Sequence, residues 1–139
     1  MEKISQRKIN NVLKYAPNYM RKIIKRLLDS KKLEIYNVKD RTIKKYQDQI
    51  EKDTNYYGFA AYHAIKDIYL IYMNSELKLS KEEHIIRLLH ELIHIWQYET
   101  KWDWVLECDS QNFSYEDDPV EKEAIRKSIR YYNNKKGIH

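Results

Sequence analysis

Residues 80–96 read SKEEHIIRLLHELIHIW and carry the strongest structural signal in the chain. Ser80 and Glu83 have the spacing of a capping box, in which each side chain accepts a hydrogen bond from the other's backbone N–H, so a helix should begin at Ser80. The apolar residues that follow cover most of the helix circumference, which predicts burial in the middle of the domain. These residues are Ile85, Ile86, Leu88, Leu89, Leu92, Ile93, Ile95 and Trp96.

This buried helix carries His90, Glu91 and His94 in the pattern HExxH. Histidines four positions apart lie on one face of a helix about one turn apart, so both imidazoles can reach one ion. The glutamate beside the first histidine can then take a proton from a water on that ion. Because these polar side chains would be costly among apolar neighbours without a metal, the pattern predicts a zinc site with Glu91 as general base.

The third zinc ligand should come from the residues after His94. The next histidine is His139, so the histidine-only metzincin pattern is absent and a carboxylate is the remaining choice. Glu121 and Glu123 lie at a suitable distance, on a helix that should begin at Pro119. They are two positions apart and point to different sides of that helix, so only one of them should face the metal.

Helical patterns flank the HExxH helix on both sides. Residues 5–28 show helical spacing interrupted by Pro17, which predicts two helices or one kinked helix, with Asn18 capping the second. Residues 40–52 predict a further helix, and residues 119–133 predict the last one.

Strand patterns lie between the helices. Residues 33–38 alternate apolar and polar side chains, as in a half-buried strand. Residues 57–63 and 68–73 predict an antiparallel hairpin, and the second strand, apolar on both faces, should be internal. Residues 100–118 have no period and predict a long irregular loop.

The composition fits one domain over residues 1–139, with a helical segment over residues 1–30. A hydrophobic fraction of 42% supplies one modest core, while two glycines and two prolines leave little material for a linker. No apolar run of about 18 residues is long enough to span a bilayer, and no signal-peptide pattern follows Met1. We therefore expect no membrane partner and a cytoplasmic location.

The charge is mildly basic, since 26 Lys and Arg against 21 Asp and Glu give a net charge of +5. Basic residues concentrate in the first third, where they form either a nucleic-acid surface or, the interpretation we favour, a solvated helix face. The single cysteine, Cys108, excludes an intrachain disulfide and a cysteine zinc cluster. The basic residues are Arg21, Lys22, Lys25, Arg26, Lys31 and Lys32.

With these motifs the sequence resembles gluzincin-type zinc peptidases, in particular the minigluzincins and the peptidase domains related to the ImmA/IrrE group. The resemblance rests on HELIH at residues 90–94, followed by the Glu121-Lys-Glu-Ala124 stretch, because those families often place a ligand glutamate three residues before an alanine. It covers roughly residues 58–132. It implies Glu121 as the third zinc ligand, with Glu123 as the alternative.

The resemblance also implies a zincin-like α+β fold, in which a small, mostly antiparallel sheet packs on the HExxH helix between N- and C-terminal helices. The edge strand, residues 57–63, would bind an extended peptide above the zinc. Gly58 would then allow close backbone approach, or it simply weakens an ordinary strand.

One position departs from the family pattern. Many gluzincins carry an aspartate four residues after the ligand glutamate, where it orients a zinc histidine, but this chain has Ile125 there. That orienting role then falls to Glu123, Asn112 or a backbone carbonyl. The donor for the oxyanion is also open. Its candidates, each with an ordinary structural explanation as well, are Arg130, Tyr131, Tyr132 and His63.

The leading hypothesis is a zinc-dependent endopeptidase that acts on a peptide or protein substrate. The alternative is a zinc-containing regulatory or binding module, whose basic first third contacts nucleic acid or a protein partner. A fourth protein ligand from Cys108, His63 or His139 would favour this module, whereas the presence of Glu91 favours the enzyme. A purely structural helical domain with an accidental motif is the third reading.

Overall fold

The protein is described by a computed structural model, which defines the structure of residues 2–47 and 57–137. In these residues helices and a small sheet combine into an α+β fold, which confirms the predicted class. The elements are β1 (Glu2–Lys3), α1 (Gln6–Leu13), α2 (Asn18–Asp29), β2 (Leu33–Val38), α3 (Asp40–Gln47), β3 (Gly58–His63), β4 (Ile68–Asn74), α4 (Lys81–Thr100), α5 (Trp102–Ser110) and α6 (Pro119–Lys136).

The strands form one mixed sheet in the order β1-β2-β4-β3. β3 and β4 pair antiparallel, as the hairpin prediction requires, and β1 pairs antiparallel with β2. The sheet also has a parallel pair, β2 with β4, so β4 is internal and β3 lies at one edge. The sequence did not indicate β1, because a pairing of two residues leaves no period to detect.

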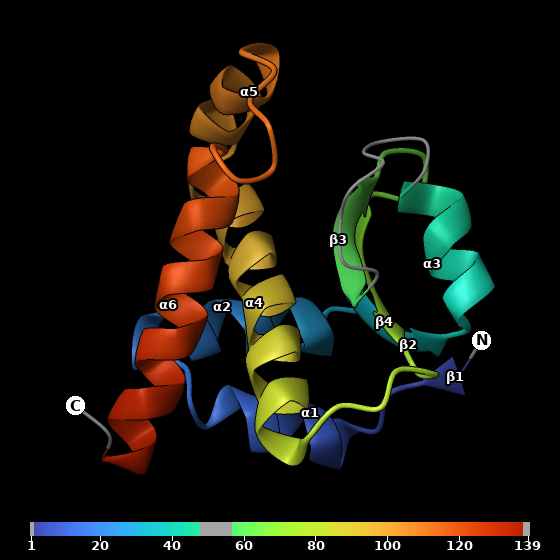
Figure 1. The fold of residues 1–139 in the computed structure, drawn as a ribbon, viewed down its shortest axis with the longest axis vertical. Coiled ribbons are helices and arrows are strands. Elements are labelled where there is room, and N and C mark those ends of the chain that lie inside the picture. Colours follow the sequence, from blue (N-terminus) through green and yellow to red (C-terminus); the bar gives the residue numbers. More distant parts are fainter. Residues whose placement is uncertain (1, 48–56, 138–139) are drawn as a thin grey trace.

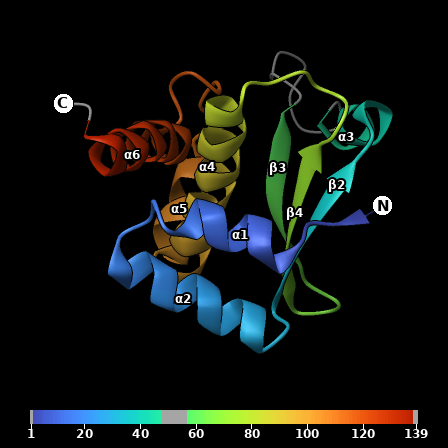
Figure 2. The same cartoon turned by 90° about the horizontal axis from the view of Figure 1, so that it is seen from below.

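The sheet is apolar on both faces, which explains the continuous apolar run of β4. Ile71 and Met73 pack into the main core together with the helices α1, α2 and α4. Tyr72 packs with Val38 and Ile43 in a smaller cluster on the other face, beneath α3. Figure 1 shows α4 standing between the sheet and α6, and Figure 2 shows α1 and α2 crossing below α4.

The N-terminal helices separate at the proline, as expected. The α2 helix begins one residue earlier than predicted, because Pro17 in an extended conformation is its N-cap and Asn18 is already helical. The prediction of Asn18 as the cap is therefore wrong, and its side chain accepts a hydrogen bond from Arg21 instead. On α2, Arg26 pairs with Glu99 of α4, while Lys22 and Lys25 are exposed and Arg21 is half-buried.

The prediction of an irregular loop over residues 100–118 is wrong in part, because α5 occupies residues 102–110. The apolar side chains of α5 do not reach the main core. The sequence of this helix therefore lacks the helical spacing of apolar residues that would have predicted it. Trp102 and Leu106 are 41% and 48% exposed, and only Cys108 of this helix is buried. The first part of the helix predicted over residues 40–52 is α3, and residues 48–52 lie outside the described residues.

The α4 helix begins as predicted, since both hydrogen bonds of the capping box between Ser80 and Glu83 are formed. The last helix begins at Pro119 as predicted and extends three residues further, to Lys136, with Gly137 in a left-handed conformation at its end. Among the described residues, no helix combines the length and the apolar character needed to cross a membrane.

Packing within the sheet explains the glycine at position 58. A Cβ atom at this position would lie 2.5 Å from the carbonyl oxygen of Tyr72 in the paired strand, which is closer than side chains tolerate. We therefore expect Gly58→Ala to lower the free energy of unfolding by about 1–3 kcal/mol, because the edge strand must shift to relieve the clash. Urea unfolding of the variant and the wild type measures the difference. Equal midpoints and slopes would show that the strand absorbs the methyl group freely.

Candidate metal centre

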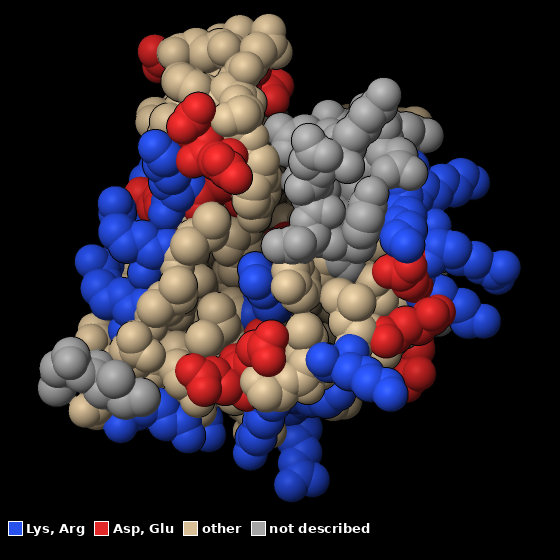
Figure 3. Space-filling view, in the orientation of Figure 1, with Lys and Arg blue, Asp and Glu red and all other residues tan. Residues whose placement is uncertain are grey.

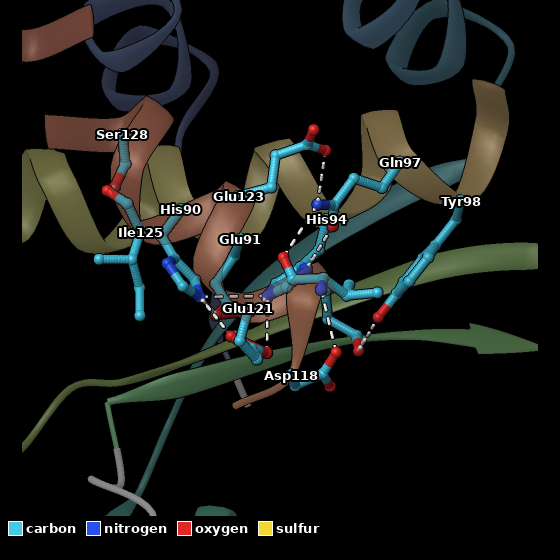
Figure 4. Close-up of polar contacts among 12 residues, drawn as sticks. His90, Glu91, His94, Gln97, Tyr98, Asp118, Glu121, Glu123, Ile125 and Ser128 are labelled. Atoms are coloured by element: carbon cyan, nitrogen blue, oxygen red, sulfur yellow. Dashed lines mark hydrogen bonds and ion pairs between the residues drawn. The ribbon is translucent and has the colours of Figure 1, made fainter. Parts of the chain in front are cut away.

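Two helices bring His90, His94 and Glu121 together. Nε2 of His90 lies 3.1 Å from Nε2 of His94, and each of these nitrogens lies 3.1 Å from Oε2 of Glu121. The three groups form the one set of potential metal ligands found among the described residues. In Figure 4 the carboxylate of Glu121 points from α6 toward both imidazoles of α4.

The start of α6 fixes the position of Glu121. The Asp118 side chain caps the helix by accepting a hydrogen bond from the backbone N–H of Val120, and Pro119 follows in the first turn. Glu121 therefore extends from the first turn, next to the middle of α4. Ala124, fully buried one turn later, lets the two helices pack closely.

The spacing of the three ligand atoms fits a zinc ion. Atoms that bind a tetrahedral zinc through bonds of about 2.0–2.1 Å lie about 3.3–3.4 Å from one another. The separations of 3.1 Å observed between the imidazole nitrogens and the carboxylate require only a small outward shift. Two imidazoles and a carboxylate are also a ligand set that zinc prefers, and three protein ligands leave a coordination position open.

Glu123 lies on a different side of α6 from Glu121. Its carboxylate accepts hydrogen bonds from Gln97 and Lys101, at 3.0 Å and 2.7 Å, and takes no part in the ligand set. Gln97 in turn lies 2.7 Å from Nδ1 of His94, so Glu123 reaches the site through another residue. Geometry thus selects Glu121 over Glu123 as the third candidate ligand.

The charges of the site are strongly coupled. Burial alone would lower the pKa of His94, but the adjacent Glu121 carboxylate outweighs this effect and raises that pKa to about 9. Burial likewise opposes ionisation of Glu121, yet the two histidines hold the pKa of this carboxyl well below its ordinary value. Without a metal, a proton on His94 therefore compensates the buried carboxylate.

Glu91 lies beside the ligand set without belonging to it. Its carboxylate is 3.7 Å from Nε2 of His90 and only 7% of the residue is exposed. Burial raises the pKa of Glu91, and the nearby histidines partly offset this effect. A carboxylate with a raised pKa next to a metal site is suited to accept and return a proton.

The three groups open onto a cleft between the edge strand and the α5 region. Gly58, Phe59 and Ala60 of β3 line one side, and Trp102 and Leu106 of α5 line the other. Tyr98 spans part of the gap, with its hydroxyl 3.4 Å from the carbonyl oxygen of Ala60 (Figure 4).

Tyr115 is a cleft residue that the sequence did not indicate. It lines the cleft from the segment between α5 and α6. Burial, together with the negative charges of Glu121 and Glu91, raises the pKa of Tyr115. Its hydroxyl therefore stays protonated beside the ligands. Neither Tyr115 nor Gln97 belongs to a recognisable motif, because only the fold brings them to the site.

The other candidates from the sequence lie elsewhere. Tyr131 hydrogen-bonds to Tyr19, and Tyr132 stacks on Tyr15, so both are structural. Nδ1 of His63 accepts a hydrogen bond from the backbone of the hairpin turn. Four more candidates are not part of the ligand set: Cys108, which is buried at the cleft wall, Asn112 at the cleft, and the exposed residues Ile125 and Arg130. His139 lies outside the described residues.

We expect zinc binding at pH 7 to release about one proton. Zinc binds neutral imidazole, whereas His94, with a pKa of about 9, carries a proton in the metal-free protein at pH 7. The apparent affinity should therefore rise about tenfold per pH unit as the pH approaches 7 from below. Calorimetric titrations in two buffers with different ionisation enthalpies count the protons. Identical heats in both buffers at pH 7 would contradict the charge assignment.

Glu121→Gln and Glu123→Gln form a matched pair, since each removes one negative charge from α6. We expect Glu121→Gln to lower zinc affinity much more, because it changes an atom of the ligand set. Competition with a chromophoric chelator measures both affinities. A larger loss in Glu123→Gln would transfer the ligand role to Glu123.

Comparisons of the chain with models of protein families, with curated proteins and with solved structures find no match. The candidate metal centre therefore stands on the residues and distances given above.

Proposed function

We propose that this protein is a zinc-dependent peptidase with a gluzincin-like site. His90, His94 and Glu121 would hold the zinc ion, and Glu91 would be the general base. The observation that carries the proposal is the convergence of three ligand atoms from two helices, with a buried carboxylate beside them and a cleft in front. A zincin-like relationship of the fold is part of the same proposal.

When bound, zinc supplies a Lewis acid that polarises a carbonyl group and lowers the pKa of water to about 7. Glu91 accepts a proton from the attacking water and returns it to the leaving amine. Its burial supports this role, because a carboxyl whose pKa is raised by burial takes up a proton more readily and can return it. The low-polarity surroundings also strengthen its interaction with the developing charges.

Tyr115 is the residue we propose for stabilising the oxyanion. Tyr115 lines the same cleft as Glu121, and its pKa, raised by burial and by the nearby carboxylates, keeps its hydroxyl a donor. A tyrosine hydroxyl near the metal is a suitable donor to the oxygen of a tetrahedral intermediate. This proposal takes the place of Arg130, Tyr131, Tyr132 and His63.

The cleft suits an extended peptide. β3 pairs with β4 along one of its edges, and residues of β3 also line the cleft. A substrate strand would therefore add to the sheet beside β3, within the cleft. Gly58 does not need a role in this contact, since its close approach is to Tyr72 within the sheet.

The segment on the opposite side of the cleft is rich in acidic residues, and Asp109 and Asp118 of this segment line the cleft. Residues 102–118 contain six acidic residues and no lysine or arginine, in a chain with a net charge of +5. Figure 3 shows acidic side chains gathered over the start of α6, with others at the edges of the α5 region. This charge would favour substrates with basic residues, because opposite charges steer association and select partners.

The alternative function is a zinc-containing binding module with little proteolysis. A fourth protein ligand would support it, but the ligand set of the described residues has three members and includes neither Cys108 nor His63. Part of its proposed basic surface is engaged within the protein, since Arg26 pairs with Glu99 and Lys32 with Asp67. These observations favour the peptidase.

We expect Glu91→Gln to retain zinc and to lose about 10²–10⁴-fold in peptide hydrolysis, because glutamine keeps the shape but cannot accept a proton. Wild type and variant are compared on a mixed peptide library at equal zinc loading. Exposed Glu82→Gln on the same helix is the control and should cleave at the wild-type rate. Equal cleavage by the Glu91 variant would exclude it as the base, and cleavage by none of the three would favour the binding module.

A further inference from the structure

We infer that Gln97 is a positioning residue for the metal centre. Val120 and Glu123 fix the orientation of the Gln97 amide, and the amide in turn fixes the tautomer of His94. This inference rests on the metal site of the proposed function and does not require proteolysis. Gln97 lies on α4 one turn after His94 and its side chain is fully buried. A buried amide needs partners for both its donors and its acceptor.

The hydrogen-bond partners of Gln97 determine where its amide nitrogen and its amide oxygen lie. One end lies 3.0 Å from the backbone carbonyl oxygen of Val120 and 3.0 Å from a carboxylate oxygen of Glu123. Both of these groups accept hydrogen bonds, so the NH₂ group must point at them. The amide oxygen must then be the atom that lies 2.7 Å from Nδ1 of His94.

The tautomer of His94 follows from this orientation. Because an amide oxygen only accepts, Nδ1 of His94 must carry the proton of that hydrogen bond. The lone pair of the neutral ring is then on Nε2, which is the nitrogen that lies 3.1 Å from Nε2 of His90 and from Glu121. Gln97 thus presents the correct nitrogen to the metal and holds the ring against rotation.

Glu123 is itself held in place. Lys101, at the junction of α4 and α5, donates to its carboxylate at 2.7 Å, and Lys127 of α6 lies 3.6 Å from the same oxygen. These contacts keep an acceptor in front of the Gln97 amide and prevent the amide from turning over. The chain from Lys101 through Glu123 and Gln97 to His94 performs the task that the sequence left open where Ile125 replaces the family's aspartate.

The tautomer can be tested directly on the wild-type protein. Long-range ¹H–¹⁵N correlation spectra of histidine-labelled protein distinguish a proton on Nδ1 from one on Nε2. We expect His94 of the zinc-loaded protein to carry its proton on Nδ1, in a hydrogen bond that exchanges slowly. The metal-free protein should show the same Nδ1 proton, whether or not Nε2 is protonated. A proton on Nε2 with zinc on Nδ1 would overturn the inference.

Zinc affinity provides the second test. Gln97→Met keeps the length of the side chain but removes its hydrogen bonds, so we expect zinc affinity to fall about 10–100-fold. Glu123→Met should lower it less, because Val120 still orients the amide, and Glu123→Gln should stay within about threefold of wild type, since its amide oxygen still accepts. The matched control is Gln111→Met, at the exposed end of α5, which should bind zinc normally.

The two tests separate the possible failures. Circular dichroism establishes that each variant is folded before its affinity is compared with that of wild type. Wild-type affinity in a folded Gln97→Met variant would overturn the inference while leaving the peptidase proposal intact. If the wild type bound no zinc, the proposed function would fall. The spectrum of the metal-free protein, recorded at a pH at which the His94 ring is neutral, would still show whether Nδ1 carries the proton.

Discussion

The contact between the first turn of α6 and the middle of α4 is the constraint on which the candidate site depends. HExxH supplies two imidazoles on one helix face, but a buried pair of histidines is not yet an open metal site. Glu121 completes the set because Asp118 caps α6 next to the histidines and Ala124 permits close packing one turn further on. The same contact buries a carboxylate against two imidazoles, which couples their protonation states and ties metal binding to proton release.

The surrounding fold serves this contact in two ways. The sheet, with β3 nearest to α4, provides one side of the cleft, and the α5 region provides the other (Figure 2). The N-terminal helices α1 and α2 pack into the core below α4, so the helix that carries the motif is supported along its length. A rigid α4 matters for the candidate metal centre, because metal ligands must keep their positions within a fraction of an ångström.

The sequence predicts the parts of this structure that depend on local patterns. Capping and period define α4, alternation defines β2, and the proline positions mark the boundary of α1 with α2 and the start of α6. Where only tertiary contacts determine the structure, the sequence yields no prediction or a wrong one. The residue pattern left both Glu121 and Glu123 open, and only the family resemblance pointed to Glu121, because the packing of α6 decides which one faces the histidines. It missed α5, whose apolar residues face a cleft, and it gave no sign of Tyr115 or Gln97, because neither has a motif.

The most direct test of the account is X-ray absorption at the zinc edge, together with metal analysis of the purified protein. The account predicts one zinc ion per chain, bound by two imidazole nitrogens and one carboxylate oxygen, with the remaining coordination filled by solvent, and loss of this signal in Glu121→Gln. Protein that binds no zinc after reconstitution at neutral pH would contradict the account. A sulfur ligand or a third histidine in the coordination shell would contradict it as well.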